Sequence, residues 1–515
     1  MQASKDVQDS LLKSLERGNQ MVKFFVEGCF NESETRVFYS PISRSPPKTF
    51  DDMTKTSKLK CKSGDFVKAH INPEIIVRRA LALAYVRDDV TVDRILAYPI
   101  GPIPSDLFHD DGTMRKCCKS DIIHLLEEEV CSSFNLPSYD KSHTVLIRDG
   151  IGIIQSMDVK KCSTFGDIVQ SYLKILLTCF FNAGTVIDVF DRYDIKNSIK
   201  SAERLRRTLS FGAQKVYQVI EGRAIPDWKK FLCNAENKQS LIRLLGEYCE
   251  WYFEESPLEG DAVLFLAGVF NNPEVVKKIS CNGVSTSVDL YSTQEEADTR
   301  ILLHSLYADN QIFSNRTKGR IVVQSSDTDV LVLCVHYFPK LENTEELWFQ
   351  TGSVSNLKDG RRFLPVHEIC RSLGPSICNL LPASHALTGC DTNSSFFGLG
   401  KKSMFKLLQR DAEKFPTLPI SFSTGDQESA VNDGRAFVAS LYDPKGKFRN
   451  LHDDLNKLRV KFATTKDANL VRIPPCENSF LQHILRAMLQ TQVWMSSHIV
   501  KSAIILPKDS GWQEG

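Results

Sequence analysis

Acidic residues follow several apolar segments of this sequence. Asp149 comes after HTVLIR, Asp191 comes after TVIDVF, and Asp327 and Asp329 come after RIVVQS. Each segment is short and rich in β-branched residues, which is typical of a buried strand. The carboxyl ends of parallel strands meet at one edge of a sheet and line the crevice where ligands bind. We therefore expect these four carboxylates to gather around one site.

Further carboxylates extend this acidic set. Glu296 and Asp298 occur in QEEADTR, and Asp391 occurs in HALTGCDTNSS. Negative charges that share a dry pocket raise one another's pKa and repel, so the site requires cations. Hard oxygen ligands favour Mg²⁺ or Mn²⁺ over zinc, which prefers histidine and cysteine. Two such ions, about 4 Å apart, activate water and stabilise the attacking and leaving oxygens of a phosphodiester.

Each acidic residue also has an ordinary structural interpretation. Asp149 in IRDG is compatible with a turn, and an aspartate in SSDTDV is compatible with a helix cap. Glu296 and Arg300 have the spacing of an ion pair on a helix surface. In a regular helix Glu296 and Asp298 point in different directions, so they converge only if Glu296 lies in the non-helical entry. The prediction therefore depends on the whole set.

Five motifs occur in order along the chain: IRDG, VFDRY, EAD, SSDTDVL and LTGCDTNSSFFGLGKKSMFKLL. Together they resemble the motifs of the flap-endonuclease/XPG class of PIN-like nucleases, including the related 5′ exonucleases. The resemblance implies a three-layer PIN-like α/β domain that hydrolyses nucleic acid with two Mg²⁺ or Mn²⁺ ions. It assigns seven residues to the metals: Asp149, Asp191, Glu296, Asp298, Asp327, Asp329 and Asp391.

The same resemblance assigns two basic residues to the substrate. The long interval between Asp191 and Glu296 leaves room for the helical gateway of the family, and it contains NSIKSAERLRR. Lys200 and Arg207 are spaced to share one helical face. In the family a lysine and an arginine at such spacing reach over the scissile phosphate. A solvated basic helix face, paired with Glu203, is the alternative interpretation.

A glycine-rich segment follows the last predicted metal ligand. Gly398 and Gly400 precede Lys401 and Lys402, and the resemblance implies a helix-hairpin-helix element over about residues 392–410 that grips a duplex. Small residues let backbone N–H groups approach a phosphate, and lysines neutralise its charge. Such binding is independent of sequence and sensitive to salt. A Gly-x-Gly pair alone usually makes only a turn between helices.

The resemblance covers about residues 140–420. The chain departs from the family in the long segment before Asp149, and in Thr392, where the family has a tyrosine. As a whole the chain also resembles a group of multi-copy, mobile-element-linked animal proteins that combine EEADTR, DTDVLVL and HALTGCDT. Members of that group often extend beyond the GW near the C-terminus, so we expect this chain to be a shortened copy.

The segments between the motifs predict the elements that position them. Strand-like and helix-like segments alternate from about residue 140, which is typical of an α/β domain with a mainly parallel sheet. We expect three parts. They are a mixed region over 1–135, a nuclease-like domain over 136–425 with a basic helical insert over about 197–255, and a C-terminal extension with an amphipathic helix over 426–515.

Composition narrows the class of protein. Of the 515 residues, 42% are hydrophobic and 25% are charged, which is typical of globular proteins. The net charge of +1 means that nucleic-acid binding requires a local patch. The 15 cysteines include no Cys-x-x-Cys pair and favour free thiols in a reducing compartment. The apolar window Tyr172–Phe190 contains charged residues, so we expect no membrane partner and an intracellular location.

These features predict a divalent-metal-dependent nuclease acting on structured DNA, with RNA as the weaker alternative. Nuclear rather than cytoplasmic residence follows if DNA is the substrate.

A second hypothesis is an inactive nucleic-acid-binding or scaffold protein. The retention of every acidic position argues against it. A third is a magnesium-dependent phosphatase, but such enzymes need Asp-x-Asp-x-Thr, and Asp327-Thr328-Asp329 is followed by Val330 and Leu331, so the threonine is misplaced. We expect His385 to be a packed or capping histidine rather than a ligand.

Overall fold

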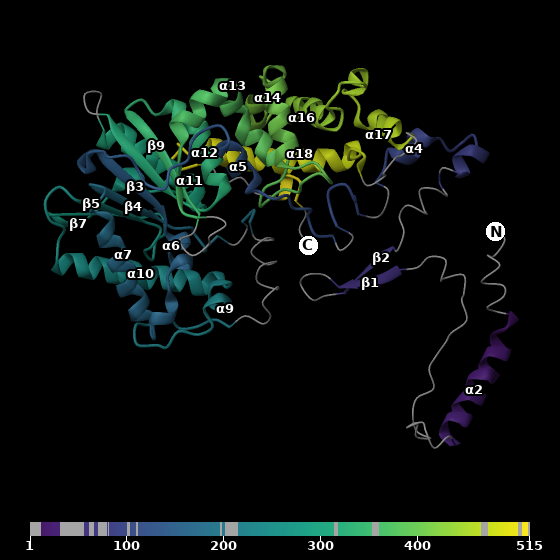
Figure 1. The fold of residues 1–515 in the computed structure, drawn as a ribbon, viewed down its shortest axis with the longest axis horizontal. Helices are drawn as coiled ribbons and strands as arrows, with labels where there is room; N and C mark the ends of the chain where they lie inside the picture. Colours follow the sequence, from purple (N-terminus) through teal and green to yellow (C-terminus); the bar gives the residue numbers. More distant parts are fainter. Residues whose placement is uncertain are drawn as a thin grey trace.

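The computed structural model describes most of the chain. The described residues are 12–30, 56–60, 66–70, 80, 82–99, 103–109, 112–195, 198–200, 215–313, 318–352, 360–464, 472–502 and 507–512. Figure 1 shows a central sheet with helices on both faces and a helical region beside it. The N-terminal part contributes helix α2 (Ser14–Phe30) and a two-stranded antiparallel sheet of β1 (Thr56–Lys60) and β2 (Phe66–His70).

A mixed sheet of eight strands forms the centre of the described structure, in the order β10-β9-β8-β3-β4-β5-β6-β7. Its strands are β3 (Thr144–Asp149), β4 (Thr185–Val189), β5 (Val263–Ala267), β6 (Val276–Ser280), β7 (Gly283–Thr286), β8 (Gly319–Gln324), β9 (Thr344–Thr351) and β10 (Arg362–Pro365). The strands from β9 to β5 are mutually parallel, and antiparallel strands flank them. The predicted α/β class with a mainly parallel sheet is confirmed.

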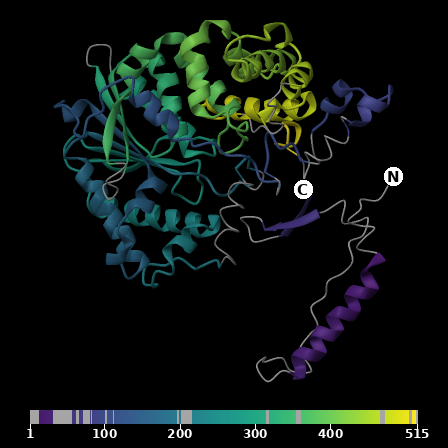
Figure 2. The same cartoon turned by 45° about the vertical axis from the view of Figure 1, so that its right-hand side comes forward.

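Helices cover both faces of this sheet and build the helical region beside it. They are α4 (Val92–Leu96), α5 (Asp121–Glu127), α6 (Gly150–Ser156), α7 (Phe165–Cys179), α9 (Trp228–Leu232), α10 (Ala235–Glu255), α11 (Ala297–Tyr307), α12 (Thr328–Tyr337), α13 (Val366–Leu387), α14 (Lys401–Asp411), α15 (Leu418–Thr424), α16 (Gln427–Tyr442), α17 (Leu455–Ala463) and α18 (Glu477–Met495). In Figures 1 and 2, α7 and α10 lie on one face of the sheet, and α11, α12 and α13 lie on the other.

Strand β3 shows how the sheet separates two apolar cores. Val145 and Ile147 belong to the core shared with α11, α12 and α13, whereas Leu146 packs against the core of α7 and α10. Successive side chains of a strand point to opposite faces, so a strand buried on both sides must be apolar throughout. This requirement explains the continuous apolar runs in the sequence and produces a three-layer arrangement.

The order of the strands places a topological switch point at β3. From β3 the chain proceeds to β4 and β5 on one side, and then crosses to β8 and β9 on the other. Connections that leave in opposite directions open a crevice at the carboxyl ends of the adjacent strands. The crevice must therefore lie where β8, β3 and β4 end.

The apolar window Tyr172–Phe190 forms the end of α7 and the buried strand β4. Thr164 and Asp167 form a capping box that fixes the start of α7. Among the described residues, no helix combines the length and the apolar character needed to cross a membrane.

A buried ion pair joins the two central strands. Arg148 and Asp188 are register partners on β3 and β4, and their side chains are 1% and 0% exposed. The guanidinium Nε and Nη2 each donate to one Asp188 oxygen at 2.6 Å, and the Tyr172 hydroxyl donates to the same carboxylate. The two hydrogen bonds of this bidentate pair offset the cost of burying both charges. The pair also fixes the register of β3 and β4 next to Asp149.

The apolar core continues through both predicted domain boundaries. Leu107 and Ile122, from the region before residue 135, belong to the same core as the β8 residue Val323. Phe437 and Ile484, from beyond residue 425, belong to it as well. Helices α15 and α16 pack against α18, and α18 packs against α13. The part of the N-terminal region from Leu107 onward and the C-terminal helices α15, α16 and α18 are thus built into the body that carries the sheet.

The predicted hairpin over residues 392–410 is wrong in detail. Residues 388–400 form a non-helical connection, and only α14 is helical within the predicted range. Thr392 and Asn393 are buried in this connection, so a short exposed turn between two helices is not formed there. The helical neighbour of α14 is α13, which packs against it. In the predicted insert over 197–255, the described part contains α9 and α10.

Candidate metal centre

Carboxylates gather at the ends of three neighbouring strands. Asp149 is the last residue of β3, Asp191 follows β4, and Asp327 follows β8. All three line one cleft of about 800 Å³, together with Asp298 and Asp391. The cleft lies at the switch point of the sheet, where the strand order predicts a binding crevice.

Asp149 and Asp327 are also helix caps. The Asp149 carboxylate accepts a hydrogen bond from the Gly152 N–H at 3.1 Å at the start of α6. The Asp327 carboxylate accepts one from the Asp329 N–H at 2.9 Å at the start of α12. Both aspartates are therefore helix caps, as their structural interpretation predicts, and both also line the cleft. A cap orients the carboxylate without using all of its lone pairs.

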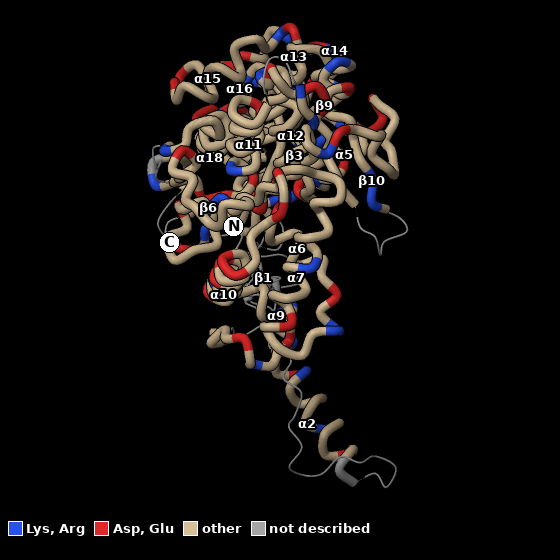
Figure 3. Tube along the Cα trace, turned by 90° about the vertical axis from the view of Figure 1, so that its left-hand side faces the viewer, with Lys and Arg blue, Asp and Glu red and all other residues tan. Residues whose placement is uncertain are grey.

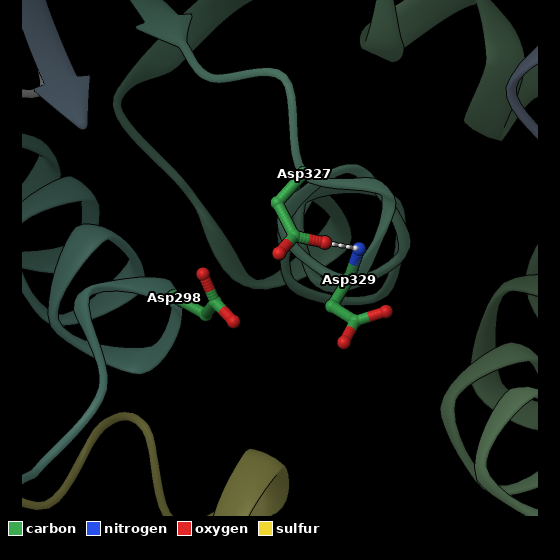
Figure 4. Close-up of side chains that lie close together, drawn as sticks. All are labelled: Asp298, Asp327 and Asp329. Atoms are coloured by element: carbon green, nitrogen blue, oxygen red, sulfur yellow. Dashed lines mark hydrogen bonds between the residues drawn. The ribbon is translucent and has the colours of Figure 1, made fainter. Parts of the chain in front are cut away.

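Asp298 and Asp327, which line the cleft, form a close group with Asp329. One carboxylate oxygen from each residue lies within 4.8 Å of the others. Figure 4 shows Asp298 from one helix facing Asp327 and Asp329 at the start of another. Asp298 and Asp329 are almost fully buried. This buried cluster of hard oxygen ligands could hold a metal ion.

Glu296 converges with Asp298 because it precedes the helix. Its backbone is extended, with φ −91° and ψ 139°, and it occupies the N-cap position of α11, while Asp298 lies in the first turn. The Lys200 ammonium lies 3.2 Å from an oxygen of each carboxylate. Glu296 therefore lies in the non-helical entry to α11, which is the condition for the two acids to converge. Both acids share one counter-ion.

Asp191 connects the end of β4 to the start of α11. Its Oδ1 accepts a hydrogen bond from the Ala297 N–H at 2.7 Å, and its Oδ2 accepts one from the Tyr193 hydroxyl at 3.2 Å. The backbone N–H of a first helical turn is a good donor to an anion. Asp191 therefore ties the segment that carries Glu296 and Asp298 to the sheet.

Lys119 is the residue of the site that sequence reasoning missed. Its Nζ donates to both oxygens of Asp329, at 3.1 and 2.9 Å, and lies 2.8 Å from Oδ1 of Asp391. It belongs to the region before residue 135, to which no role was assigned. The sequence KCCKS carries no pattern that identifies Lys119, because its partners are more than 200 residues away.

His385 is packed, as expected, but it also contacts the site. Its ring is fully buried, and Nε2 lies 2.9 Å from Oδ1 of Asp329. Burial lowers the pKa of His385 to about 4, so the ring is neutral near pH 7. A neutral ring must present Nε2–H to the carboxylate, because two acceptors would repel. His385 therefore orients Asp329.

The carboxyl groups of the cleft differ in pKa because their neighbours differ. Burial, with the charge of Asp191, raises the pKa of Asp149 to about 7. Burial also raises the pKa of Glu296 to about 7 and that of Asp298 well above its usual value, against the pull of Lys200. Burial opposes ionisation of Asp329 too, but Lys119 and His385 hold its pKa well below the usual value. Asp149, Glu296 and Asp298 therefore gain most from an added cation.

These pKa values predict a pH-dependent effect of metal on stability. In the metal-free protein, the raised pKa values of Asp149 and Glu296 mean that the folded state binds protons between about pH 4 and pH 7 that the unfolded chain has lost. The thermal unfolding midpoint of the metal-free protein should therefore decrease as the pH rises from about 4 to about 7. Bound Mn²⁺ requires ionised ligands. The Mn²⁺-induced rise in midpoint should be at least about 2 °C larger at pH 8 than at pH 6.

Differential scanning fluorimetry with and without Mn²⁺ measures this difference. The Glu296→Gln variant is the matched comparison, because it removes one titrating group and should reduce the pH dependence. An Mn²⁺ effect of equal size at pH 6 and pH 8 in the wild-type protein would contradict the assignment of these carboxylates to the metal.

The predicted duplex-binding segment is only partly on the surface. Gly398 adopts the left-handed backbone conformation, with φ +74°, and Gly400 is the N-cap of α14. Lys402 is exposed and lies 3.9 Å from Asp121. Lys401 is fully buried, and its Nζ donates to the His385 carbonyl at 2.7 Å. The predicted phosphate contact of Lys401 is therefore wrong, because its ammonium fixes the end of α13 instead.

The two basic residues predicted to contact the scissile phosphate have different outcomes. Arg207 lies outside the described residues. Lys200 lines the cleft, and its ammonium lies against Glu296 and Asp298. A phosphate contact of Lys200 stays a prediction.

Part of the wall of the cleft is aromatic and basic. It includes Tyr193, Trp228 and Lys238, from the end of β4 and from α9 and α10. The Lys238 ammonium lies 5.2 Å from the centre of the Tyr193 ring, within the range of a cation–π contact. Trp228 is stacked on Phe231, with ring centroids 5.5 Å apart. Such a wall offers flat apolar and positive surfaces to a ligand.

Comparison with known proteins adds no identification. A scan of the chain against protein-family models finds no matching model, and a search of curated proteins finds no match. The functional assignment therefore depends on the chemistry and geometry of the cleft.

Proposed function

We propose that this protein is a divalent-metal-dependent nuclease that hydrolyses phosphodiester bonds of structured DNA. One observation carries the proposal. Carboxylate oxygens of Asp298, Asp327 and Asp329 lie within 4.8 Å of one another, and Asp298 and Asp327 line a cleft at the carboxyl ends of parallel strands. The sequence resemblance to PIN-like nucleases supports the same assignment.

The chemistry of the donor set fits Mg²⁺ or Mn²⁺. The clustered ligands are carboxylate oxygens, which these ions prefer, and the cluster includes neither histidine nor cysteine. Oε1 of the buried Glu296 receives no hydrogen bond, whereas Oε2 lies 3.2 Å from the Lys200 ammonium, so Oε1 has ligand capacity to spare. Asp298, Asp327 and Asp329 would hold an ion, with Asp149, Asp191, Glu296 and Asp391 as the other acids of the set. A bound divalent ion lowers the pKa of water and stabilises charge at phosphoryl oxygens.

The residues of the chain would position the substrate around this centre. Trp228 and Tyr193 offer ring surfaces to bases, and Lys238 offers positive charge to the backbone. Figure 3 shows basic and acidic residues mixed along the described chain. Binding would therefore depend on this local wall rather than on the net charge of the protein. DNA as substrate would favour a nuclear location.

A panel of labelled substrates tests this proposal. Flap, nicked and single-stranded DNA, and RNA of the same sequence, are incubated with the full chain in Mg²⁺, Mn²⁺ or EDTA. Metal-dependent cutting that favours structured DNA is the expected result. Equal hydrolysis in EDTA, or hydrolysis only of a small phosphomonoester, would contradict the proposal.

A second candidate function has one specific observation in its favour. The ammonium groups of Lys119 and Lys200 already compensate Asp329, Asp391, Glu296 and Asp298. A protein that uses lysines as permanent counter-ions could bind nucleic acid without hydrolysing it. Tight, salt-sensitive DNA binding without cutting in any metal would support this inactive scaffold instead.

The predicted contact of Lys200 with the scissile phosphate leads to a separate test. In Lys200→Met, cleavage should fall about a hundredfold, the usual cost of losing one group that stabilises transition-state charge. Mn²⁺ binding should not weaken, because the ammonium competes with the ion for Glu296 and Asp298. Single-turnover cleavage and calorimetric titration measure the two effects. The exposed Lys406 provides a matched control as Lys406→Met. Weaker Mn²⁺ binding in Lys200→Met would contradict this role.

A further inference from the structure

Lys119 makes three contacts with two carboxylates of the centre. Its Nζ donates to Oδ1 and Oδ2 of Asp329 and lies 2.8 Å from Oδ1 of Asp391. An ammonium group has three N–H donors, and these three oxygens can take all of them. The group therefore lies between Asp329 and Asp391, where a divalent ion bridging those residues would have to lie.

The fold fixes this ammonium in place. Lys116 donates to the carbonyl oxygens of Cys390 and Asp391, at 3.2 and 2.7 Å, and the Cys117 thiol contacts the Gly389 carbonyl. Helix α5, which begins two residues after Lys119, packs against α14 and α12. The segment of Lys119 and the segment of Asp391 are thus held together by several contacts besides the ion pair.

The Asp329 carboxylate has few lone-pair sites left for a metal ion. A carboxylate offers about four lone-pair sites on its two oxygens. Oδ1 of Asp329 takes the hydrogen bonds from His385 and Lys119, and Oδ2 takes a second one from Lys119. One site is left, on Oδ2. Asp329 can therefore serve as a ligand to one ion, together with Asp298 and Asp327.

We propose that Lys119 replaces one of the two divalent ions expected for this centre. Its ammonium acts as the permanent counter-ion of Asp329 and Asp391, so the protein binds a single divalent ion at Asp298, Asp327 and Asp329. Lys119 lines the cleft and is 21% exposed, so its charge faces the space available to a substrate phosphate. This inference rests on the proposed metal-dependent function, which it makes more specific.

The number of Mn²⁺ ions bound per chain tests the inference without any assay of activity. The full chain is titrated with Mn²⁺ at pH 8, and free ion is followed by electron paramagnetic resonance. The wild-type protein should bind one ion. Lys119→Met should bind two, and its first ion should bind at least about tenfold tighter, because a neighbouring positive charge is gone. Lys119→Arg should restore a count of one, and the control Lys406→Met should leave it at one.

The outcomes separate the inference from the function on which it rests. Two ions in the wild-type protein, or one ion of unchanged affinity in Lys119→Met, would overturn the role of Lys119 and leave the metal centre standing. No Mn²⁺ bound to the wild-type protein would overturn both. The wild-type count decides the question even if Lys119→Met fails to fold.

Discussion

Replacing Asp327 and Asp329 together by asparagine should lower metal-dependent cleavage at least about a thousandfold. A metal ion contributes several kcal/mol of transition-state stabilisation, and each 1.36 kcal/mol is about tenfold in rate. The substitution removes two charges from the cluster of carboxylates within 4.8 Å of one another. The asparagine at position 327 keeps a side-chain oxygen that can accept the hydrogen bond from the backbone N–H of residue 329 at the start of α12. Single-turnover cleavage of flap DNA measures the rate.

The control for this double variant is an exposed aspartate outside the cleft. Asp261 lies in the turn before β5, and Asp261→Asn should cut DNA at the wild-type rate. Circular dichroism checks that the double variant is folded. If the folded double variant cut within tenfold of the wild-type rate, the metal cluster would not be the catalytic centre.

Replacing Asp188 by asparagine should destabilise the protein by about 3–5 kcal/mol. Removing one partner of a buried ion pair leaves the other charge uncompensated in an apolar environment. Arg148 is 1% exposed, and both of its hydrogen bonds to Asp188 are 2.6 Å long. The shape of the side chain is conserved, so the loss reflects charge rather than packing. Chemical-denaturant unfolding, followed by tryptophan fluorescence, measures the change in free energy of unfolding.

An exposed ion pair gives the matched comparison for this variant. Asp158 pairs with Lys161 on the surface, with both side chains more than half exposed. Asp158→Asn should not change the free energy of unfolding measurably, because exposed pairs are screened by water. A loss below about 1 kcal/mol in Asp188→Asn would show that the buried pair does not stabilise the sheet.

Local pattern was sufficient to predict the strands that position the acids. The segments that form β3, β4 and β8 are apolar because both faces of the sheet are covered, and each is followed by aspartate. The crevice follows from the meeting of parallel strand ends. The convergence of Glu296 and Asp298 could be stated only as a condition, since it depends on where α11 begins.

Contacts between distant segments could not be predicted in the same way. Lys119 reaches Asp329 through the packing of α5 on α12 and α14, and no spacing in the sequence encodes that packing. Lys401 follows a Gly-x-Gly pair, but burial of its ammonium under His385 depends on how α13 and α14 meet. The same dependence on tertiary packing explains why residues 392–396, predicted as part of a hairpin, are buried in a non-helical connection.

Metal contact with the scissile phosphate is the central claim, and a phosphorothioate tests it most directly. Flap DNA with one non-bridging sulfur at the cleavage position is compared with normal DNA in Mg²⁺ and in Mn²⁺. Sulfur is a poor ligand for the hard Mg²⁺ ion and a better one for Mn²⁺. The account predicts that sulfur slows cleavage strongly in Mg²⁺ and that Mn²⁺ restores it. Equal slowing in both metals, or cleavage that persists in EDTA, would contradict a metal ion at the reacting phosphate.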